Sequence, residues 1–327
     1  MAGISGREEN TYKIEAKIER DISSYPEILS EYYYSMDRNT PVTKRAYIGY
    51  LMEYFDYIRE KTGKEASVEY FDSVKPYDIN YYMNTIKYNK EGKLNHESIR
   101  ACKLFAIKSF YKFLFINGLI KSNPCNFVVP PKVTEEKEVI RLESEDKKNI
   151  LNCIRQENDK YGKQKELIFV LGWRTGLRVT EMVEINISDI DFQKKTIKVT
   201  TKGNKKRIID IESGTIEYIK DWMTVRSSLG IPADCDALFV SDRKRRLTVR
   251  SVERYVSKYS SMAGRNDITP HKLRSTFGSD SYDATGDVYL VASLLGHSSP
   301  KTTTRYAAVS EKKKRSVAIL LDQEDNK

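Results

Sequence analysis

The chain has 327 residues, of which 39% are hydrophobic and 31% charged, so it is long enough for two globular domains and too apolar for a disordered chain. Its 56 lysines and arginines exceed its 46 acidic residues, and the resulting net charge of +10 favours a polyanionic partner such as nucleic acid. The spacing of the four cysteines does not match a metal-binding motif. The start of the chain has no apolar signal segment, and no apolar run reaches the roughly 18 residues of a membrane span. We therefore expect a cytoplasmic protein that is not bound to a membrane.

Residues 21–128 have the apolar spacing of an all-helical domain. The first 20 are polar, and we expect them to be flexible. Capping residues followed by proline at Pro26 and Pro41 predict two helix starts, and Gly63 predicts the end of the second helix. The sequence therefore predicts a flexible segment over 1–20 and a helical domain over 21–128, with further helices over 77–88 and from about Asn95 to Gly118.

Lysines interrupt the apolar pattern of the helix that ends at Gly118. Lys103, Lys108 and Lys112 fall among its apolar residues, which suits a helix with one face on a core and another on DNA phosphates. An ordinary amphipathic helix with a solvated face is the alternative. Lys44 and Arg45, on the helix that begins at Pro41, are further candidates for DNA contacts.

A stiff connection separates the two halves of the chain. Pro130 and Pro131 cannot continue a helix, and the charged residues 135–138 follow them. We therefore assign an interdomain linker to 129–139 and a second domain to 140–327.

The second domain combines helices with one small sheet. Capped or apolar helices are expected from Ser144 and over 167–173, and later ones from Pro270 and Pro300. Alternating apolar and polar residues predict three strands, over 190–192, 196–200 and 207–211. The fold class is therefore mainly α with a small antiparallel sheet.

Basic and nucleophilic side chains recur along this second domain. The set contains two guanidiniums, one ammonium, two imidazoles and one phenol: Arg178, Arg274, Lys202, His271, His297 and Tyr306. Positive donors around a phosphate, an in-line nucleophile and a proton donor are what metal-free phosphoryl transfer requires. Lys205 and Lys206 share the loop of Lys202 and are competing candidates for the ammonium. Lys205 and Arg207 are also candidates for DNA contacts.

The order and spacing of these residues resemble the tyrosine recombinase (phage integrase) family over about residues 140–310. The resemblance rests on four segments: Thr175 to Glu181, His271 to Arg274, Leu294 to Ser299, and Tyr306. It implies a two-domain clamp on double-stranded DNA, formed by a helical core-binding domain and a catalytic domain, and a reaction without metal, ATP or other cofactor.

The resemblance also implies a role for each matching residue. Tyr306 would attack a DNA phosphate to form a 3′-phosphotyrosyl link and release a 5′ hydroxyl. Arg178 and Arg274 would stabilise the pentacoordinate phosphate. Glu181 would be the acidic residue that supports the active site without contacting the phosphate.

Three further roles follow from the same resemblance. Lys202 would protonate the departing 5′ oxygen, His271 would deprotonate Tyr306 or relay its proton, and His297 would hydrogen-bond a phosphate oxygen.

Assembly and partners follow from the family as well. We expect a homotetramer on two inverted-repeat sites that exchanges strands through a Holliday junction. Accessory proteins could take part in this exchange.

The basic run from Lys312 and the apolar residues 317–321 form a tail that either docks on its own domain or joins protomers. A type IB topoisomerase-like nicking and closing enzyme, or a non-catalytic sequence-specific DNA-binding regulator, are the alternatives.

Overall fold

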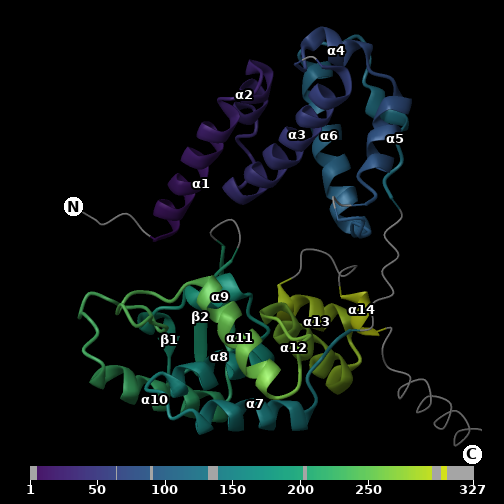
Figure 1. Cartoon of the computed structure of the whole chain (residues 1–327). Coiled ribbons are helices and arrows are strands. Elements are labelled where there is room, and N and C mark those ends of the chain that lie inside the picture. Colours follow the sequence, from purple (N-terminus) through teal and green to yellow (C-terminus); the bar gives the residue numbers. More distant parts are fainter. Residues whose placement is uncertain are drawn as a thin grey trace, which may run out of the picture. The chain divides into compact units, whose positions relative to one another are not determined.

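The computed structural model describes residues 6–63, 65–88, 91–131, 139–201, 205–296 and 303–307. Contacts divide the chain into two compact units, residues 1–136 and 137–327. The division falls within the stretch assigned above to the linker. Figure 1 shows the elements of both units, which are described separately below.

The first unit is helical throughout its described part. Its elements are α1 (Gly6–Ile22), α2 (Glu27–Tyr34), α3 (Pro41–Thr62), α4 (Val68–Ser73), α5 (Pro76–Thr85), α6 (Glu97–Ile116) and a short 3₁₀ turn (Pro124–Phe127). The predicted signals for α3 are confirmed: the Thr40 hydroxyl accepts a hydrogen bond from the Thr43 backbone N–H at 3.3 Å, and Gly63 ends the helix at φ 68°. The buried faces of α2, α3 and α6 meet in one core that contains many aromatic rings.

Helix α1 contradicts the expected flexible segment. Residues 6–22 form a helix that contacts α3, and Ile18 and Ile22 are each only 2% exposed. Ile14 packs against the same core. These three isoleucines are spaced four residues apart, so they form an apolar stripe on an otherwise polar helix. The low overall hydrophobicity of the segment concealed this stripe.

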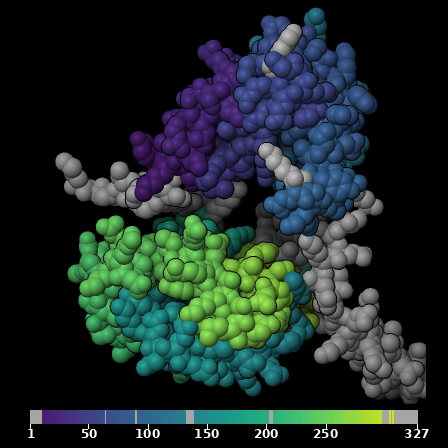
Figure 2. All heavy atoms as spheres, viewed as in Figure 1, coloured from purple at the N-terminus to yellow at the C-terminus, as the bar shows by residue number. Residues whose placement is uncertain are grey.

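The second unit packs helices around a small sheet. Its elements are α7 (Ser144–Gln156), α8 (Gly162–Thr175), α9 (Val179–Val183), β1 (Ile190–Asp191), β2 (Thr196–Thr200), β3 (Lys206–Asp210), α10 (Ser213–Ser228), α11 (Val249–Met262), α12 (Pro270–Thr285), α13 (Val288–Leu295) and α14 (Thr304–Ala307). Helix α8 is buried at nearly every position and contacts α10 and α12, so it is the central helix of this unit. In Figure 2 the teal residues from the start of this unit lie against the green and yellow-green residues of its later part in one packed body.

The sheet has the predicted antiparallel order β1-β2-β3. Val199 pairs with Arg207 and Ile197 with Ile209, while Lys198 pairs with Ile208. Since side chains alternate along a strand, Arg207 and Ile209 share the face that carries the buried Val199 and Ile197, and Lys198 and Ile208 are exposed on the other face. In the described residues no helix is long and apolar enough to cross a membrane.

Candidate active site

A tight turn between α8 and α9 positions Arg178. Gly176 ends α8 at φ 61°, and a Cβ atom there would lie 2.4 Å from Cδ1 of Phe277 and 2.9 Å from Cδ2 of Leu295. Only glycine fits both the backbone conformation and the space. The turn places Arg178 at the N-cap of α9, with 40% of its side chain exposed.

Glu181 is the buried acidic group of this site. It is 3% exposed and accepts hydrogen bonds from the backbone N–H of Arg178 at 2.9 Å and from its Nη1 at 2.8 Å. Nη2 of Arg207 lies 3.6 Å from the second carboxylate oxygen. One buried carboxylate therefore holds Arg178 in place and partly balances two guanidiniums.

Arg274 lies in the interior, on the first turns of α12. It is 2% exposed, and its guanidinium donates to the carbonyls of Gly176, at 2.5 Å, and Leu295. Burial, followed by the nearby Arg178 guanidinium, lowers the pKa of Arg274 to about 10. The charged form of a buried arginine beside another guanidinium is stabilised when an anion binds next to it. This property would suit a group that binds a phosphate.

Tyr306 lies on α14 and is 2% exposed. Its ring packs with Val291 and Leu295 of α13 and rests against Gly278 of α12, where a Cβ atom would lie only 2.7 Å from Cζ of the ring. The proximity of Tyr306 also acts electrostatically on Arg274. The phenol and the arginine therefore occupy one neighbourhood, although they are 32 residues apart in the chain.

The structure thus brings together Arg178, Glu181, Arg274 and Tyr306. His271 is exposed on the first turn of α12, the helix that carries Arg274. Lys202 and His297 lie outside the described residues, as does the tail after residue 307, so the predictions for them stay predictions. In the described part no group of three or more potential metal ligands forms a cluster.

Arg207 was expected to contact DNA, but the structure places it inside the unit. Only 18% of its side chain is exposed, and its Nη1 donates to the carbonyl of Leu294 at 2.6 Å. The sequence contained a signal for this position, because Arg207 shares the alternation of Ile209 and Ile211 and therefore the inner face of the strand.

The other DNA-contact candidates differ in their surroundings. Lys103 is paired with Glu53, and Lys108 donates to the carbonyl of Val128 at 2.6 Å, so both make contacts within the first unit. The Lys44 ammonium lies 5.1 Å from the ring centroid of Tyr33. Arg45, Lys112 and Lys205 are exposed.

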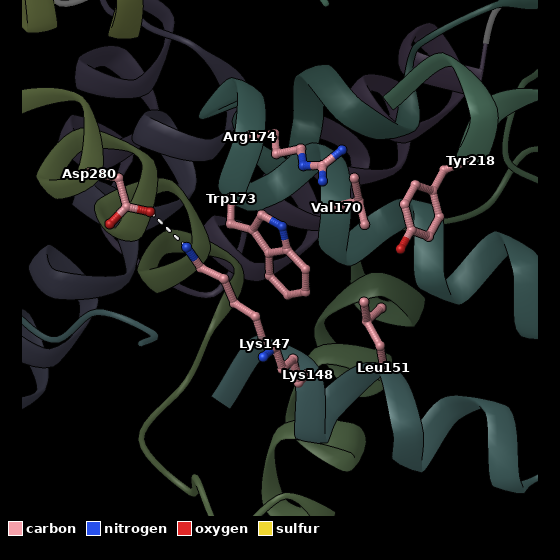
Figure 3. Close-up of a pocket in the computed structure, with 8 residues that line it drawn as sticks. All are labelled: Lys147, Lys148, Leu151, Val170, Trp173, Arg174, Tyr218 and Asp280. Atoms are coloured by element: carbon pink, nitrogen blue, oxygen red, sulfur yellow. Dashed lines mark hydrogen bonds and ion pairs between the residues drawn. The ribbon is translucent and has the colours of Figure 1, made fainter. Parts of the chain in front are cut away.

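A separate pocket of about 300 Å³ lies between α7, α8, α10 and α12. Figure 3 shows its lining, with Trp173 and Arg174 from α8 and an ion pair of 2.7 Å between Lys147 and Asp280. None of the clustered residues Arg178, Glu181, Arg274 and Tyr306 lines it. The pocket is therefore distinct from the candidate active site.

Comparisons with known proteins agree with this geometry. Residues 140–313 match the model of the phage integrase family. The chain is 31% identical to a tyrosine recombinase XerC from Syntrophus aciditrophicus over 87% of this chain and 93% of the relative. It is 30% identical to a tyrosine recombinase XerC from Caldanaerobacter subterraneus subsp. tengcongensis over 89% of this chain and 85% of the relative.

Solved structures share the fold at lower sequence identity. One is the XerH site-specific recombinase bound to a palindromic difH substrate in a post-cleavage complex, with a TM-score of 0.67 and 20% identity over 86% of this chain and 80% of that one. Another is a lambda integrase dimer bound to a COC′ core site, with a TM-score of 0.64 and 19% identity over 88% of this chain and 79% of that one. The family model, the relatives and the clustered arginines and tyrosine agree, and the chain belongs to the phage integrase family of tyrosine recombinases.

Proposed function

We propose that this tyrosine recombinase breaks and rejoins DNA through a covalent bond between Tyr306 and a DNA phosphate. The observation that supports this most directly is the neighbourhood of Arg274, which brings together Tyr306, Arg178 and the buried Glu181 carboxylate that holds Arg178. Preorganised guanidiniums stabilise charge as it develops on phosphate oxygens, and they do so most effectively where water is excluded.

The proposed step conserves the number of phosphate ester bonds. The phenolic oxygen of Tyr306 attacks phosphorus, the bond to the 5′ oxygen breaks, and that oxygen leaves as a hydroxyl after receiving a proton from Lys202. His271 takes the proton of Tyr306, and His297 donates a hydrogen bond to a phosphate oxygen. In the second step the 5′ hydroxyl of another strand attacks the phosphotyrosine and releases Tyr306, so no ATP is consumed.

At the level of DNA, we propose exchange between short inverted-repeat sites by a homotetramer through a Holliday junction. A lambda integrase tetramer bound to a Holliday junction shares the fold, with a TM-score of 0.64 and 19% identity. The net charge of +10 supports a DNA partner, and binding should weaken steeply as salt rises. Exposed Arg45, Lys112 and Lys205, together with Lys44, are proposed contacts to the DNA backbone. Lys103 and Lys108 would first have to leave their internal partners.

Covalent capture tests the chemistry. Wild-type protein, Tyr306→Phe and the control Tyr282→Phe are incubated with a pool of nicked suicide duplexes that carry random and host-derived sequences, and the trapped DNA is sequenced. Tyr282 packs in the same small cluster as Tyr306, so its variant loses a hydroxyl at a neighbouring ring. We expect trapping by the wild type and Tyr282→Phe on one shared inverted repeat, and none by Tyr306→Phe.

Other outcomes would replace the proposal. Equal trapping by Tyr306→Phe would show that another residue is the nucleophile. Trapping without a shared sequence, together with relaxation of supercoiled DNA, would favour the topoisomerase-like alternative. Sequence-specific binding by all three proteins without any trapping would favour the regulator.

A further inference from the structure

Three arginines from three elements converge on the last carbonyls of α13. Arg207 of β3 donates to the carbonyl of Leu294, Arg274 of α12 donates to that of Leu295, and Nη2 of Arg178 lies 3.5 Å from that of Gly296. The final carbonyls of a helix have no partner within the helix and carry the negative end of its dipole. The end of α13 is therefore a common acceptor for the two proposed catalytic arginines and for Arg207.

Arg207 is the residue of the sheet that contacts both the end of α13 and Glu181. Besides its bond to Leu294, it approaches the buried carboxylate of Glu181 at 3.6 Å, so it connects the end of α13 to the group that orients Arg178. Gly296 lies directly on it, since a Cβ atom at Gly296 would lie 3.1 Å from Nη1 of Arg207. Moving the Arg207 guanidinium would therefore move both the end of α13 and the surroundings of Glu181.

The energetic cost of this placement indicates that it serves the site. Nε and Nη2 of Arg207 are buried and find no hydrogen-bond partner among the residues that the structure describes, and an unsatisfied buried donor costs about 1–3 kcal/mol. Burial, together with the nearby Arg178 guanidinium, lowers the pKa of Arg207. An apolar residue beside Val199 would avoid these costs, so fold stability alone does not account for an arginine here.

We propose that Arg207 is a positioning residue of the recombination reaction, which fixes the end of α13 and the Glu181 carboxylate and thereby the guanidiniums of Arg178 and Arg274, without contacting the DNA phosphate itself. The kinetic test of this inference requires the proposed function, because it measures cleavage of DNA. The structural test uses the free protein and does not require that function. It assigns to Arg207 a role different from that of the exposed Lys205 two residues earlier.

The structural test uses selective labelling of the free full-length protein. The sequence contains the pair Leu–Gly three times, at 171–172, 229–230 and 295–296. Labelling leucine carbonyl carbons with ¹³C and glycine nitrogens with ¹⁵N therefore gives three resonances in a carbonyl–amide correlation spectrum. One of them reports the Leu295 carbonyl that Arg274 binds, and Leu229–Gly230, distant from the site in the sequence, is the internal control.

The variants are Arg207→Met, Arg207→Lys and the control Lys198→Met. Lys198 is exposed on the opposite face of the sheet, so its variant removes one positive charge without reaching α13. We expect the 295–296 resonance to shift or broaden in Arg207→Met, with 229–230 unchanged, and all three resonances to stay in place in Lys198→Met. An unchanged 295–296 resonance in a folded Arg207→Met protein would overturn the proposal.

The kinetic test separates positioning from phosphate contact. With the inverted repeat found by covalent capture, Arg207→Met should cleave bound DNA about 100-fold more slowly, the typical cost of a misplacement near 1 Å. Its affinity for DNA should have the same salt dependence as that of the wild type. Arg207→Lys should recover only part of the rate, because one ammonium cannot reproduce the planar fork that faces both Leu294 and Glu181.

Two kinetic results would overturn the proposal. A salt slope reduced by about 0.9 would show that Arg207 neutralises a phosphate directly. Wild-type cleavage by Arg207→Met would show that the contact with α13 is dispensable. Failure of the wild type to trap any DNA would contradict the proposed function instead, and the spectroscopic test of Arg207 would still hold.

Discussion

At the scale of single residues, the arrangement of the arginines in the site depends on one buried carboxylate, that of Glu181. Glu181 is the acidic side chain that contacts Arg178 and approaches Arg207, and it is almost completely buried. A buried charge that loses its partners is costly, and the same holds for the partners that remain. The two arginines and Glu181 therefore stabilise one another and cannot be changed independently.

Glu181→Gln is expected to destabilise the second unit and to impair cleavage. The amide keeps one acceptor oxygen but places an NH₂ group against a guanidinium, so the free energy of unfolding should fall by about 3 kcal/mol. Urea unfolding measures the change. Glu184→Gln, an exposed position at the end of the same short helix, is the control and should have little effect.

Gly278→Ala is expected to displace the Tyr306 ring. Alanine favours a helix over glycine by about 1 kcal/mol, but here its methyl group would lie 2.7 Å from the ring, so the ring must move. Nitration by tetranitromethane, followed by mass spectrometry of the Tyr306 peptide, should show greater modification in this variant. Tyr12, which is 73% exposed, is the internal standard.

Gly162→Ala is the matched control for this change, because, apart from its own helix backbone and chain neighbours, no atom of the described residues lies within 4 Å of a Cβ atom at Gly162. Its Tyr306 peptide should be nitrated as slowly as that of the wild type. Equal nitration in Gly278→Ala and Gly162→Ala would show that the ring does not depend on the missing methyl group.

The predictions from sequence succeeded where one residue type marks the end of a helix. They failed where a side chain contacts a residue of a distant helix or strand. The end of α3 at Gly63 was found because a glycine that ends a helix leaves a local pattern. The internal position of Arg207 depends on Leu294, 87 residues later in the chain, and no local pattern reports that distance. Strand alternation indicated its face but not its partner.

At the scale of elements, α12 is the helix on which the site depends, and several contacts fix it. Leu273 packs so closely on α8 that a Cβ atom at Gly172 would lie 2.8 Å from its side chain. Asp280 pairs with Lys147 of α7, and Asp283 pairs with Arg141. The helix that carries Arg274 is therefore held on both its buried and its exposed sides.

A second set of contacts joins the start of α8 to α11. The ammonium of Lys165, whose side chain is 6% exposed, pairs with Asp159 and donates to the Tyr259 hydroxyl at 2.6 Å. Burial alone would raise the pKa of Asp159, but Lys165 and the backbone N–H of Tyr161 outweigh it and hold the pKa below its usual value. The pair should therefore stabilise the fold at neutral pH.

Asp159→Asn tests this pair through its pH dependence. Because the folded-state pKa is lowered, the contribution is fully present above the unfolded pKa, near 4, and is lost as pH falls through the folded value. We expect the variant to be less stable by about 2 kcal/mol at pH 7, since it leaves a buried ammonium poorly paired. At pH 3 the difference from the wild type should shrink, and a difference that did not depend on pH would contradict the ion pair as its cause.

The elements themselves were predictable to different degrees. The sheet and the capped helix α3 follow from strong local signals, whereas α1 was missed because three isoleucines among charged residues are a weak signal without the core they contact. Tertiary burial decided the structure of that segment.

At the scale of the whole molecule, each unit has a hydrophobic core of its own. We expect fragments 1–131 and 139–327 to fold separately, each with a cooperative thermal transition, because a domain with its own core needs little from its neighbour. Circular dichroism of the fragments and calorimetry of the full chain measure this. A helical fragment 1–131 that melts without cooperativity would show that the first core depends on the second unit.

The burial of Tyr306 has a consequence for fidelity. If Tyr306 is the nucleophile, as proposed, a phosphate cannot approach it in line while the residue is only 2% exposed, so Tyr306 would have to move before DNA is cut. The cleavage rate on any DNA is then scaled by the fraction of molecules in which the phenol is uncovered, and only a ligand that favours the uncovered form restores the full rate. Chance encounters with unrelated DNA are penalised by the whole of this factor. Under the proposed mechanism, discrimination between the correct site and the rest of a genome would therefore be stricter than the difference in binding affinity alone.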